Sequence, residues 1–332
     1  MNLETKYLGF VLHSPLVVSA IPLSQDIDNI KRMEDAGAGA VVLYSLFEEQ
    51  IRIEQQILHY YREHPTATPA DALNLFPAQK QFHTRRDDYL EHVSKAKDSV
   101  AIPIIASLNC RSLGNWTDFA EQIEQAGADA LELNVYHIPA NRDQTSEQIE
   151  AMYLTIARIV KEAVKIPVAI KLAPYFTNMA NMARRLDETG VDALVLFNRF
   201  LQPDLDPKTL ELKSNIPLGN PSDLRLPLHW IASLYGHVKA DLAATGGIQS
   251  AEDVVKMLMV GAKVTMLASA LIREGIDHLR TVEHDLCAWM DENDYDSIDS
   301  MQGILRQFHS KDTASFERGE YIRAITSHEA DV

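Results

Sequence analysis

The sequence has few cysteines, and this shortage excludes two ways of building a protein. Cys110 and Cys287 are the only 2 cysteines among the 332 residues. They offer no disulfide framework, and they cannot ligate an iron–sulfur cluster without other residue types. A chain with so few thiols suits a reducing compartment, so we expect a cytoplasmic protein.

Basic charge and long apolar runs are also scarce. The 31 Lys and Arg residues are outnumbered by 47 Asp and Glu residues, which leaves a formal net charge of −16. A nucleic-acid surface needs clustered basic side chains to displace counterions, so we expect no nucleic-acid partner. No apolar run approaches the roughly 20 residues of a membrane-spanning helix, and the first residues lack the pattern of a signal peptide. We therefore expect no membrane partner.

The sequence does contain a unit that occurs four times. In each copy an amphipathic helix ends at a glycine, and an apolar run follows after a short turn. A glycine at this place can adopt the left-handed conformation that ends a helix, and the apolar run is typical of a buried strand. The copies are DNIKRMEDAGAGAVVL, DFAEQIEQAGADALEL, MARRLDETGVDALVL and DVVKMLMVGAKVTML, and their glycines are Gly37, Gly127, Gly190 and Gly261.

Four further apolar runs lie between these copies, so the sequence predicts eight strands. The runs are SPLVVSA, IPIIASL, IPVAIKL and ADLAATGG. Apolar strands that alternate with helices suit a parallel sheet covered on both faces. We expect one domain over residues 1–332, a (β/α)8 TIM barrel with extra N-terminal and loop elements and a C-terminal helical tail over about residues 276–332. A doubly wound open sheet is the main alternative, but no GxGxxG follows the first strand.

The ends of the last two predicted strands carry residues that suit a phosphate. Gly246 and Gly247 follow the seventh strand and precede a helix, so backbone N–H groups and the positive helix end can approach an anion. Ala268 and Ser269 follow the eighth strand, and this fold usually binds phosphate at the loops after strands seven and eight. The alternative is that the two glycines only form a tight turn. A bound phosphate would belong either to a sugar phosphate or to a flavin.

Several segments resemble the dihydroorotate dehydrogenase family, in the same order and at compatible spacing. They are LELNV, VAIKLAPYF, ATGGIQSAEDVVKMLMVGA and MLASALIREG, and the resemblance extends from SPLVVSA onward. It implies an FMN-containing barrel that oxidises dihydroorotate in pyrimidine synthesis by hydride transfer to flavin N5, with Gly246, Gly247, Ala268 and Ser269 at the FMN phosphate. It also implies that Lys171 contacts the flavin near N1 and O2, where a fixed cation stabilises the reduced ring.

The resemblance assigns further residues to the site. Asn134 and Asn198 match asparagines that hydrogen-bond the pyrimidine ring, and Asn74 matches a third. A buried asparagine can instead satisfy loop backbone. Small residues at strand ends are expected to line the flavin, although they also suit any tightly packed barrel layer, and these residues are Ser19, Ala20, Ser45 and Ser107.

The sequence departs from the family at the substrate end. His137 stands at the place of the catalytic Cys or Ser, where an imidazole can take a proton from a carbon acid; the alternative is a solvated loop residue. Tyr44 replaces a lysine that contacts flavin and substrate, and Pro139 replaces an asparagine. Arg199 can supply the missing positive charge to a carboxylate, or form a salt bridge with one of the many acidic residues. The substrate is therefore expected to be dihydroorotate or a related dihydropyrimidine-like compound.

Three functions stay open at this stage. The first is an FMN oxidoreductase in which His137 and Lys171 are catalytic and the small-molecule substrate is bound by Tyr44, Arg199 and the three asparagines. The second is a flavin-free barrel aldolase or isomerase with a Schiff base on Lys171. The third is a non-catalytic flavin- or pyrimidine-binding protein. No NAD or iron–sulfur motif and no metal site is predicted, so electrons would pass to a soluble small molecule or a separate electron-transfer protein, and the acidic tail is compatible with a homodimer.

Overall fold

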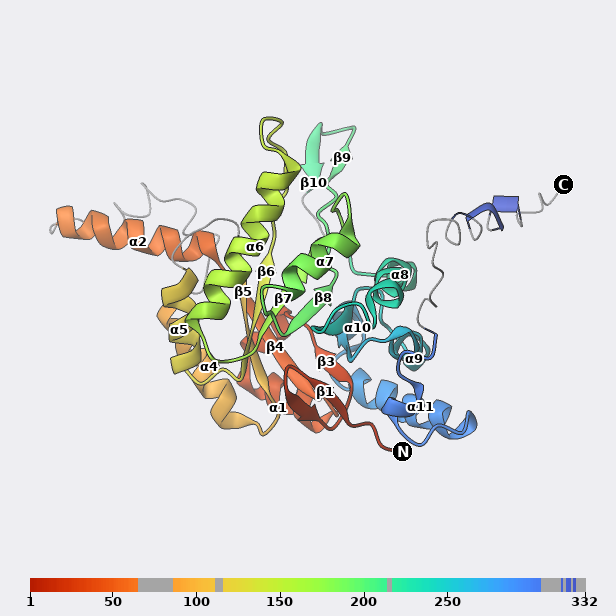
Figure 1. The fold of residues 1–332 in the computed structure, drawn as a ribbon. Helices are drawn as coiled ribbons and strands as arrows, with labels where there is room; N and C mark the ends of the chain where they lie inside the picture. Colours follow the sequence, from red (N-terminus) through yellow and green to blue (C-terminus); the bar gives the residue numbers. More distant parts are fainter. Residues whose placement is uncertain are drawn as a thin grey trace.

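The computed structural model describes residues 1–64, 86–110, 116–213 and 217–305, together with 318, 321–323, 325 and 326. Eight parallel strands close into a barrel surrounded by helices (Figure 1), which confirms the predicted fold. Around the barrel the strands follow chain order: β3 (Leu16–Val18), β4 (Ala40–Phe47), β5 (Ile104–Cys110), β6 (Ala130–Val135), β7 (Val168–Leu172), β8 (Ala193–Leu196), β11 (Asp241–Thr245) and β12 (Val264–Leu267). Each of these strands overlaps one of the eight predicted apolar runs.

Helices connect the strands and form the outer layer. They are α1 (Ile27–Asp35), α2 (Glu48–Glu63), α4 (Arg86–Ser99), α5 (Trp116–Gln125), α6 (Ser146–Ala163), α7 (Met179–Asp187), α8 (Arg225–Leu234), α9 (Ala251–Val260), α10 (Ser269–Glu274), α11 (His278–Glu292) and α12 (Ile298–Met301), with short 3-10 turns η1 (Pro22–Gln25) and η3 (Pro221–Leu224). The four repeated glycines adopt the predicted left-handed conformation, with φ of +96° at Gly37, +95° at Gly127, +84° at Gly190 and +116° at Gly261.

Three of the repeated units also carry a carboxylate that ties one unit to the next. Glu34, Glu124 and Asp187 each lie three residues before the repeated glycine. Each accepts hydrogen bonds from two consecutive backbone N–H groups that lead into the strand after the unit's own strand, at distances of 2.7–3.1 Å. These bonds satisfy amides that would otherwise be unpaired at the amino-terminal end of the barrel.

The barrel interior is filled at its amino-terminal end by apolar side chains. The hairpin β1 (Thr5–Tyr7) and β2 (Phe10–Leu12) contributes Tyr7, Leu8 and Leu12 to a buried cluster with inward-facing strand residues such as Val17 and Val264. The Leu8 N–H donates to Asp241 at the start of β11. Because this end is closed by packed side chains, a ligand site is left at the carboxyl ends of the strands, as is usual in this fold.

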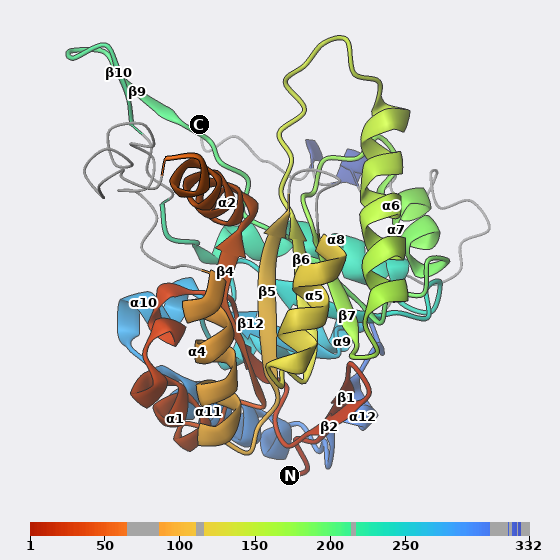
Figure 2. The same ribbon diagram turned by 90° about the vertical axis from the view of Figure 1, so that its left-hand side faces the viewer.

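Additional elements surround that carboxyl end. After the second barrel strand, the helix α2 projects away from the barrel (Figure 1). The long connection after β8 forms a hairpin that sequence analysis did not anticipate, β9 (Asp204–Asp206) and β10 (Glu211–Lys213), and it lies at the same end as α2 (Figure 2).

The first of the predicted C-terminal helices, α11, packs on the barrel. Leu279, Val282, Leu286 and Met290 of α11 are buried in the main core cluster together with residues of α9 and α10. Within the described residues, no helix combines the length and the apolar character needed to cross a membrane.

Candidate functional site

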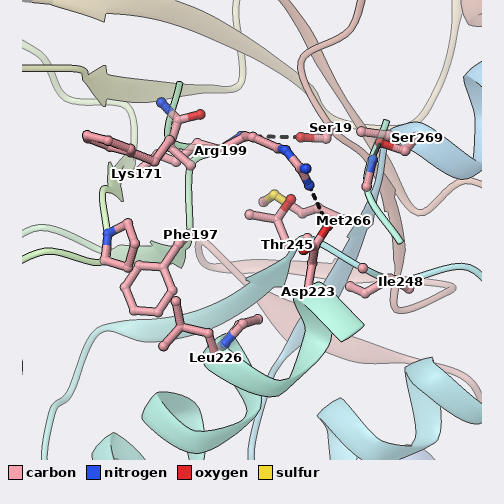
Figure 3. Close-up of a pocket in the computed structure, with 18 of the residues that line it drawn as sticks. Ser19, Lys171, Phe197, Arg199, Asp223, Leu226, Thr245, Ile248, Met266 and Ser269 are labelled. Atoms are coloured by element: carbon pink, nitrogen blue, oxygen red, sulfur yellow. Dashed lines mark hydrogen bonds and ion pairs between the residues drawn. The ribbon is translucent and has the colours of Figure 1, made fainter. Parts of the chain in front are cut away.

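A pocket of about 470 Å³ opens at the carboxyl ends of the strands (Figure 3), and its volume lies in the range of small-molecule sites. It brings together residues that are far apart in the sequence. Of the predicted site residues it is lined by Ser19, Ala20, Lys171, Asn198, Arg199, Gly246, Gly247, Ala268 and Ser269. The expected phosphate residues and the expected flavin-contacting lysine therefore line one cavity.

The two consecutive glycines at one wall have different roles. Gly246 and Gly247 both have positive φ, +101° and +78°. A Cβ on Gly247 would lie 2.4 Å from the backbone nitrogen of Leu224, so only glycine fits against η3. A Cβ on Gly246 would meet nothing within 4 Å, so this residue lies beside open space that a ligand can occupy. The glycine pair therefore forms both a tight packing contact and one wall of the cavity.

Ser269, which begins α10 after the neighbouring strand β12, forms another part of the wall. Its Oγ accepts a hydrogen bond from the Gly219 N–H at 2.8 Å, so the hydroxyl hydrogen is available for a ligand. Gly219, which sequence analysis missed, lies in the long connection after β8 and also lines the pocket. The N–H groups just before α9 are bonded within the protein: the Asp253 carboxylate accepts hydrogen bonds from the N–H groups of Gln249 and Ser250. These two amides are therefore committed to the helix cap.

Lys171 lies deep in the barrel, on β7. Its side chain is only 7% exposed, and its Nζ donates to Ser19 Oγ at 3.2 Å and to Glu132 Oε1 at 3.4 Å. Sequence analysis missed Glu132, although a glutamate inside the apolar run LELNV, two residues before Asn134, is a signal that it faces the same interior. Its other oxygen, Oε2, is buried and has no hydrogen-bond partner within the described residues. Lys171 and Glu132 thus form a buried ion pair, and Glu132 Oε2 can still accept a hydrogen bond.

Side-chain amides gather at the ends of β5, β6 and β8. Asn198 Nδ2 donates to Asn134 Oδ1 at 2.8 Å. The parallel register also places Asn109 next to Asn134. Asn109 was not selected from the sequence, yet the period of two in a strand puts it on the same face as Ser107. The predicted Asn74 lies outside the described residues.

An irregularity in β4 decides which side chain faces the interior. The register with β5 shifts between Val42 and Ser45, and the Oγ atoms of Ser45 and Ser107 lie 2.8 Å apart. The ring of Tyr44 instead packs edge-on against Tyr89 of α4, with centroids 5.2 Å apart. Ser45 and Ser107 therefore contact each other, and Tyr44 contacts the helical layer; none of the three lines the described pocket.

Burial keeps the tyrosine beneath this serine pair neutral. The Tyr89 hydroxyl donates to the Ser107 carbonyl at 3.1 Å and accepts from the Ser107 N–H at 2.8 Å. Desolvation raises the pKa of Tyr89 well above its ordinary value. A neutral phenol can hold both bonds at once, which fixes the middle of β5.

His137 lies in the loop after β6 and does not line the described pocket. Both of its ring nitrogens are buried without a hydrogen-bond partner in the described part of the chain. The Tyr153 phenol interacts with the backbone of His137; burial raises the pKa of Tyr153 to about 12, although this interaction lowers it. Pro139, two residues later, is exposed. The expectation of a solvated imidazole therefore does not describe this side chain.

Arg199 lines the pocket but is already paired. Its Nη1 contacts Oδ2 of Asp223, a residue of η3, and Figure 3 shows the guanidinium pointing to this carboxylate. This is the salt bridge that the sequence allowed as an alternative to a substrate contact. Among the described residues, no group of three or more His, Cys, Asp or Glu side chains is arranged to hold a metal ion.

Comparison with known proteins gives relatives over nearly the whole length. The family model for dihydroorotate dehydrogenase matches residues 63–290. The catalytic subunit of dihydroorotate dehydrogenase B (NAD(+)) from Methanothermobacter thermautotrophicus is 26% identical over 313 residues, which cover 91% of this chain and 98% of that protein. The subunit of the same name from Methanocaldococcus jannaschii is 25% identical over 314 residues, covering 92% and 98%. Because the family model matches more than half of the chain, this chain belongs to the dihydroorotate dehydrogenase family of oxidoreductases.

Proposed function

We propose that the chain is an FMN-dependent oxidoreductase that oxidises dihydroorotate or a related dihydropyrimidine-like compound. The observation that carries the proposal is a single cavity with Gly246, Gly247, Ala268 and Ser269 at its walls and the buried ammonium of Lys171 in the same space. The residues present fit FMN, because the Cβ direction of Gly246 is open and the Ser269 hydroxyl can donate. When bound, FMN supplies the hydride acceptor.

Lys171 would serve as a fixed cation beside the flavin ring. Its Nζ is held by Ser19 and Glu132, so its position does not depend on the ligand. A preorganised charge stabilises negative charge that develops next to it without further reorganisation. Ser19, Ala20, Ser45 and Ser107 would leave room for the planar ring, because their side chains are small.

The asparagines would orient a substrate that carries ring amides. Asn134 and Asn198 are hydrogen-bonded to each other, and Asn109 is adjacent to Asn134 in the sheet register. Side-chain amides offer both donors and acceptors, so they suit a pyrimidine ring with alternating N–H and C=O groups. A site built in this way rejects analogues that lack these groups, because its own polar atoms are then left unpaired.

His137 would transfer the proton. Its two ring nitrogens are buried and unpartnered among the described residues, which is costly unless a ligand or water completes their hydrogen bonds. An imidazole has one nitrogen that can accept a proton and one that can donate, so it can act as acid or base for a carbon-bound proton.

Electrons would leave through another protein. The relatives from two archaea are named catalytic subunits of an NAD(+) enzyme. A catalytic subunit implies a further subunit in those enzymes, and we propose that this chain likewise transfers electrons to a separate partner and forms homodimers.

Absorbance spectroscopy of the purified chain, as isolated and after incubation with FMN, tests the proposal. We expect bound flavin, and anaerobic bleaching by dihydroorotate or dihydrouracil. If the protein contains no flavin as isolated and binds none after incubation with FMN, the proposed function is refuted. In that case, borohydride trapping of a carbonyl substrate on Lys171 would favour the aldolase alternative. Bound flavin that no dihydropyrimidine bleaches would favour a binding protein without catalytic activity.

A further inference from the structure

We infer that Arg199 selects a phosphorylated ligand in this pocket and that Asp223 holds its guanidinium until a phosphate is bound. The inference rests on the proposed function for the identity of the ligand, FMN. In this inference Arg199 binds at the phosphate end of the cavity, whereas the sequence suggested that it binds a substrate carboxylate.

The surroundings of Gly219 show where the guanidinium of Arg199 lies. The position that a Gly219 Cβ would occupy lies 3.3 Å from Ser269 Oγ, 3.5 Å from Arg199 Nη1 and 3.5 Å from Asp223 Oδ2. A hydroxyl, a guanidinium and a carboxylate therefore surround one point next to the expected phosphate residue. All of these residues line the same pocket as the Gly246 turn. Arg199 is thus at the phosphate end of the cavity without any change of backbone.

The chemistry of the pair permits an exchange of partners. A guanidinium binds carboxylate and phosphate with the same planar arrangement of donors. A phosphate monoester carries about −1.5 to −2 charges near neutral pH, whereas a carboxylate carries one, so phosphate is the stronger competitor. The side chains of Arg199 and Asp223 are 34% and 31% exposed, so neither is locked by packing. Asp223 Oδ2 also accepts from the Asn220 N–H at 3.0 Å, and this bond keeps the carboxylate in place when the guanidinium moves.

Two other cations near this point, Lys171 and Arg273, are committed, whereas Arg225 also lines the pocket and is exposed. Lys171 is paired with Glu132 inside the barrel. Arg273 donates to Gln249 Oε1 at 2.5 Å and to the Gly219 carbonyl at 3.1 Å, which fixes the wall of the pocket. Arg199 differs from Lys171 and Arg273, because its present partner, Asp223, is a partly exposed side chain that a ligand anion can replace.

The experiment compares FMN with riboflavin, which differs only by the phosphate. Dissociation constants are measured by flavin fluorescence for the full-length wild type, Arg199→Gln, Asp223→Asn, the double variant and Arg184→Gln. Arg184 of α7 is a matched control, because it forms an exposed ion pair with Glu188 and does not line this pocket.

For Arg199→Gln we expect the Kd for FMN to rise at least about tenfold, or about 1.4 kcal/mol, while the Kd for riboflavin changes less than about twofold. For Asp223→Asn we expect the Kd for FMN to fall about two- to fivefold, and this gain should vanish in the double variant, since it acts through Arg199. Arg184→Gln should behave as wild type.

Equal losses of FMN and riboflavin affinity in Arg199→Gln would overturn the inference, and so would weaker FMN binding in Asp223→Asn. A thermal melt by circular dichroism verifies that each variant is folded. If the wild type binds neither flavin, the proposed function fails, and inorganic phosphate becomes the probe. Weaker phosphate binding by Arg199→Gln than by wild type would then support the role of Arg199, and equal binding would refute it.

Discussion

Replacing Lys171 with methionine should destabilise the chain by leaving the Glu132 carboxylate buried without its cation. The two charged groups lie 3.4 Å apart, and their side chains are 7% and 1% exposed. At an effective dielectric constant of about 20, two unit charges at this distance attract each other by about 5 kcal/mol. Desolvation offsets part of this attraction, but removing one partner of a buried pair commonly costs about 3–5 kcal/mol. We therefore expect the free energy of unfolding to fall by about that amount.

The double variant Glu132→Gln/Lys171→Met distinguishes this cause from lost packing. It removes both charges and keeps the side-chain sizes, so it should recover most of the stability lost in Lys171→Met. The measurement is urea unfolding of the flavin-free protein followed by circular dichroism. If Lys171→Met is as stable as wild type, or if the double variant is no more stable than the single one, the buried ion pair does not have the energetic role described here.

Three further results are expected. His137→Ala should slow flavin reduction in stopped-flow experiments by about 10²–10⁴-fold without raising the Kd for FMN, and unchanged kinetics would remove His137 from the mechanism. Gly247→Ala should lower the melting temperature, because its Cβ would lie 2.4 Å from the Leu224 nitrogen; a melting temperature equal to that of wild type would contradict the assigned packing. Burial raises the pKa of Asp241 in the folded chain, so the contribution of this carboxyl to stability is greatest below its unfolded pKa and declines as the pH rises through the folded value. Asp241→Asn should therefore gain stability relative to wild type at neutral pH and lose that advantage near pH 3, roughly below the ordinary Asp pKa; a difference independent of pH would refute this.

Much of the fold was predictable because its signals are local. Each repeated unit places a helix, a left-handed glycine such as Gly127 and a buried strand within about sixteen consecutive residues, and neighbouring residues alone determine these features. The glycine pair Gly246 and Gly247 was predictable for the same reason, because two adjacent residues carry the signal for the turn. The hairpin β9–β10 was not predicted, because proline-rich, polar segments with short strands have little periodicity.

The arrangement of the site depended on contacts between distant residues. A register shift in β4 placed Ser45, rather than Tyr44, beside Ser107, and no pattern within that strand indicates where such a shift occurs. Pairing of β6 with β7 brought Glu132 to Lys171, and η3 supplied Asp223 to Arg199.

The sequence by itself therefore determined the barrel, its glycine turns and the residue types available at the strand ends, because helix and strand periodicity are read over short distances. Only the tertiary structure decided which of those side chains face the cavity and which charges neutralise each other. Electrostatic partners such as Arg199 and Asp223 are chosen by proximity in space, and proximity across the barrel mouth follows from closure of the whole sheet.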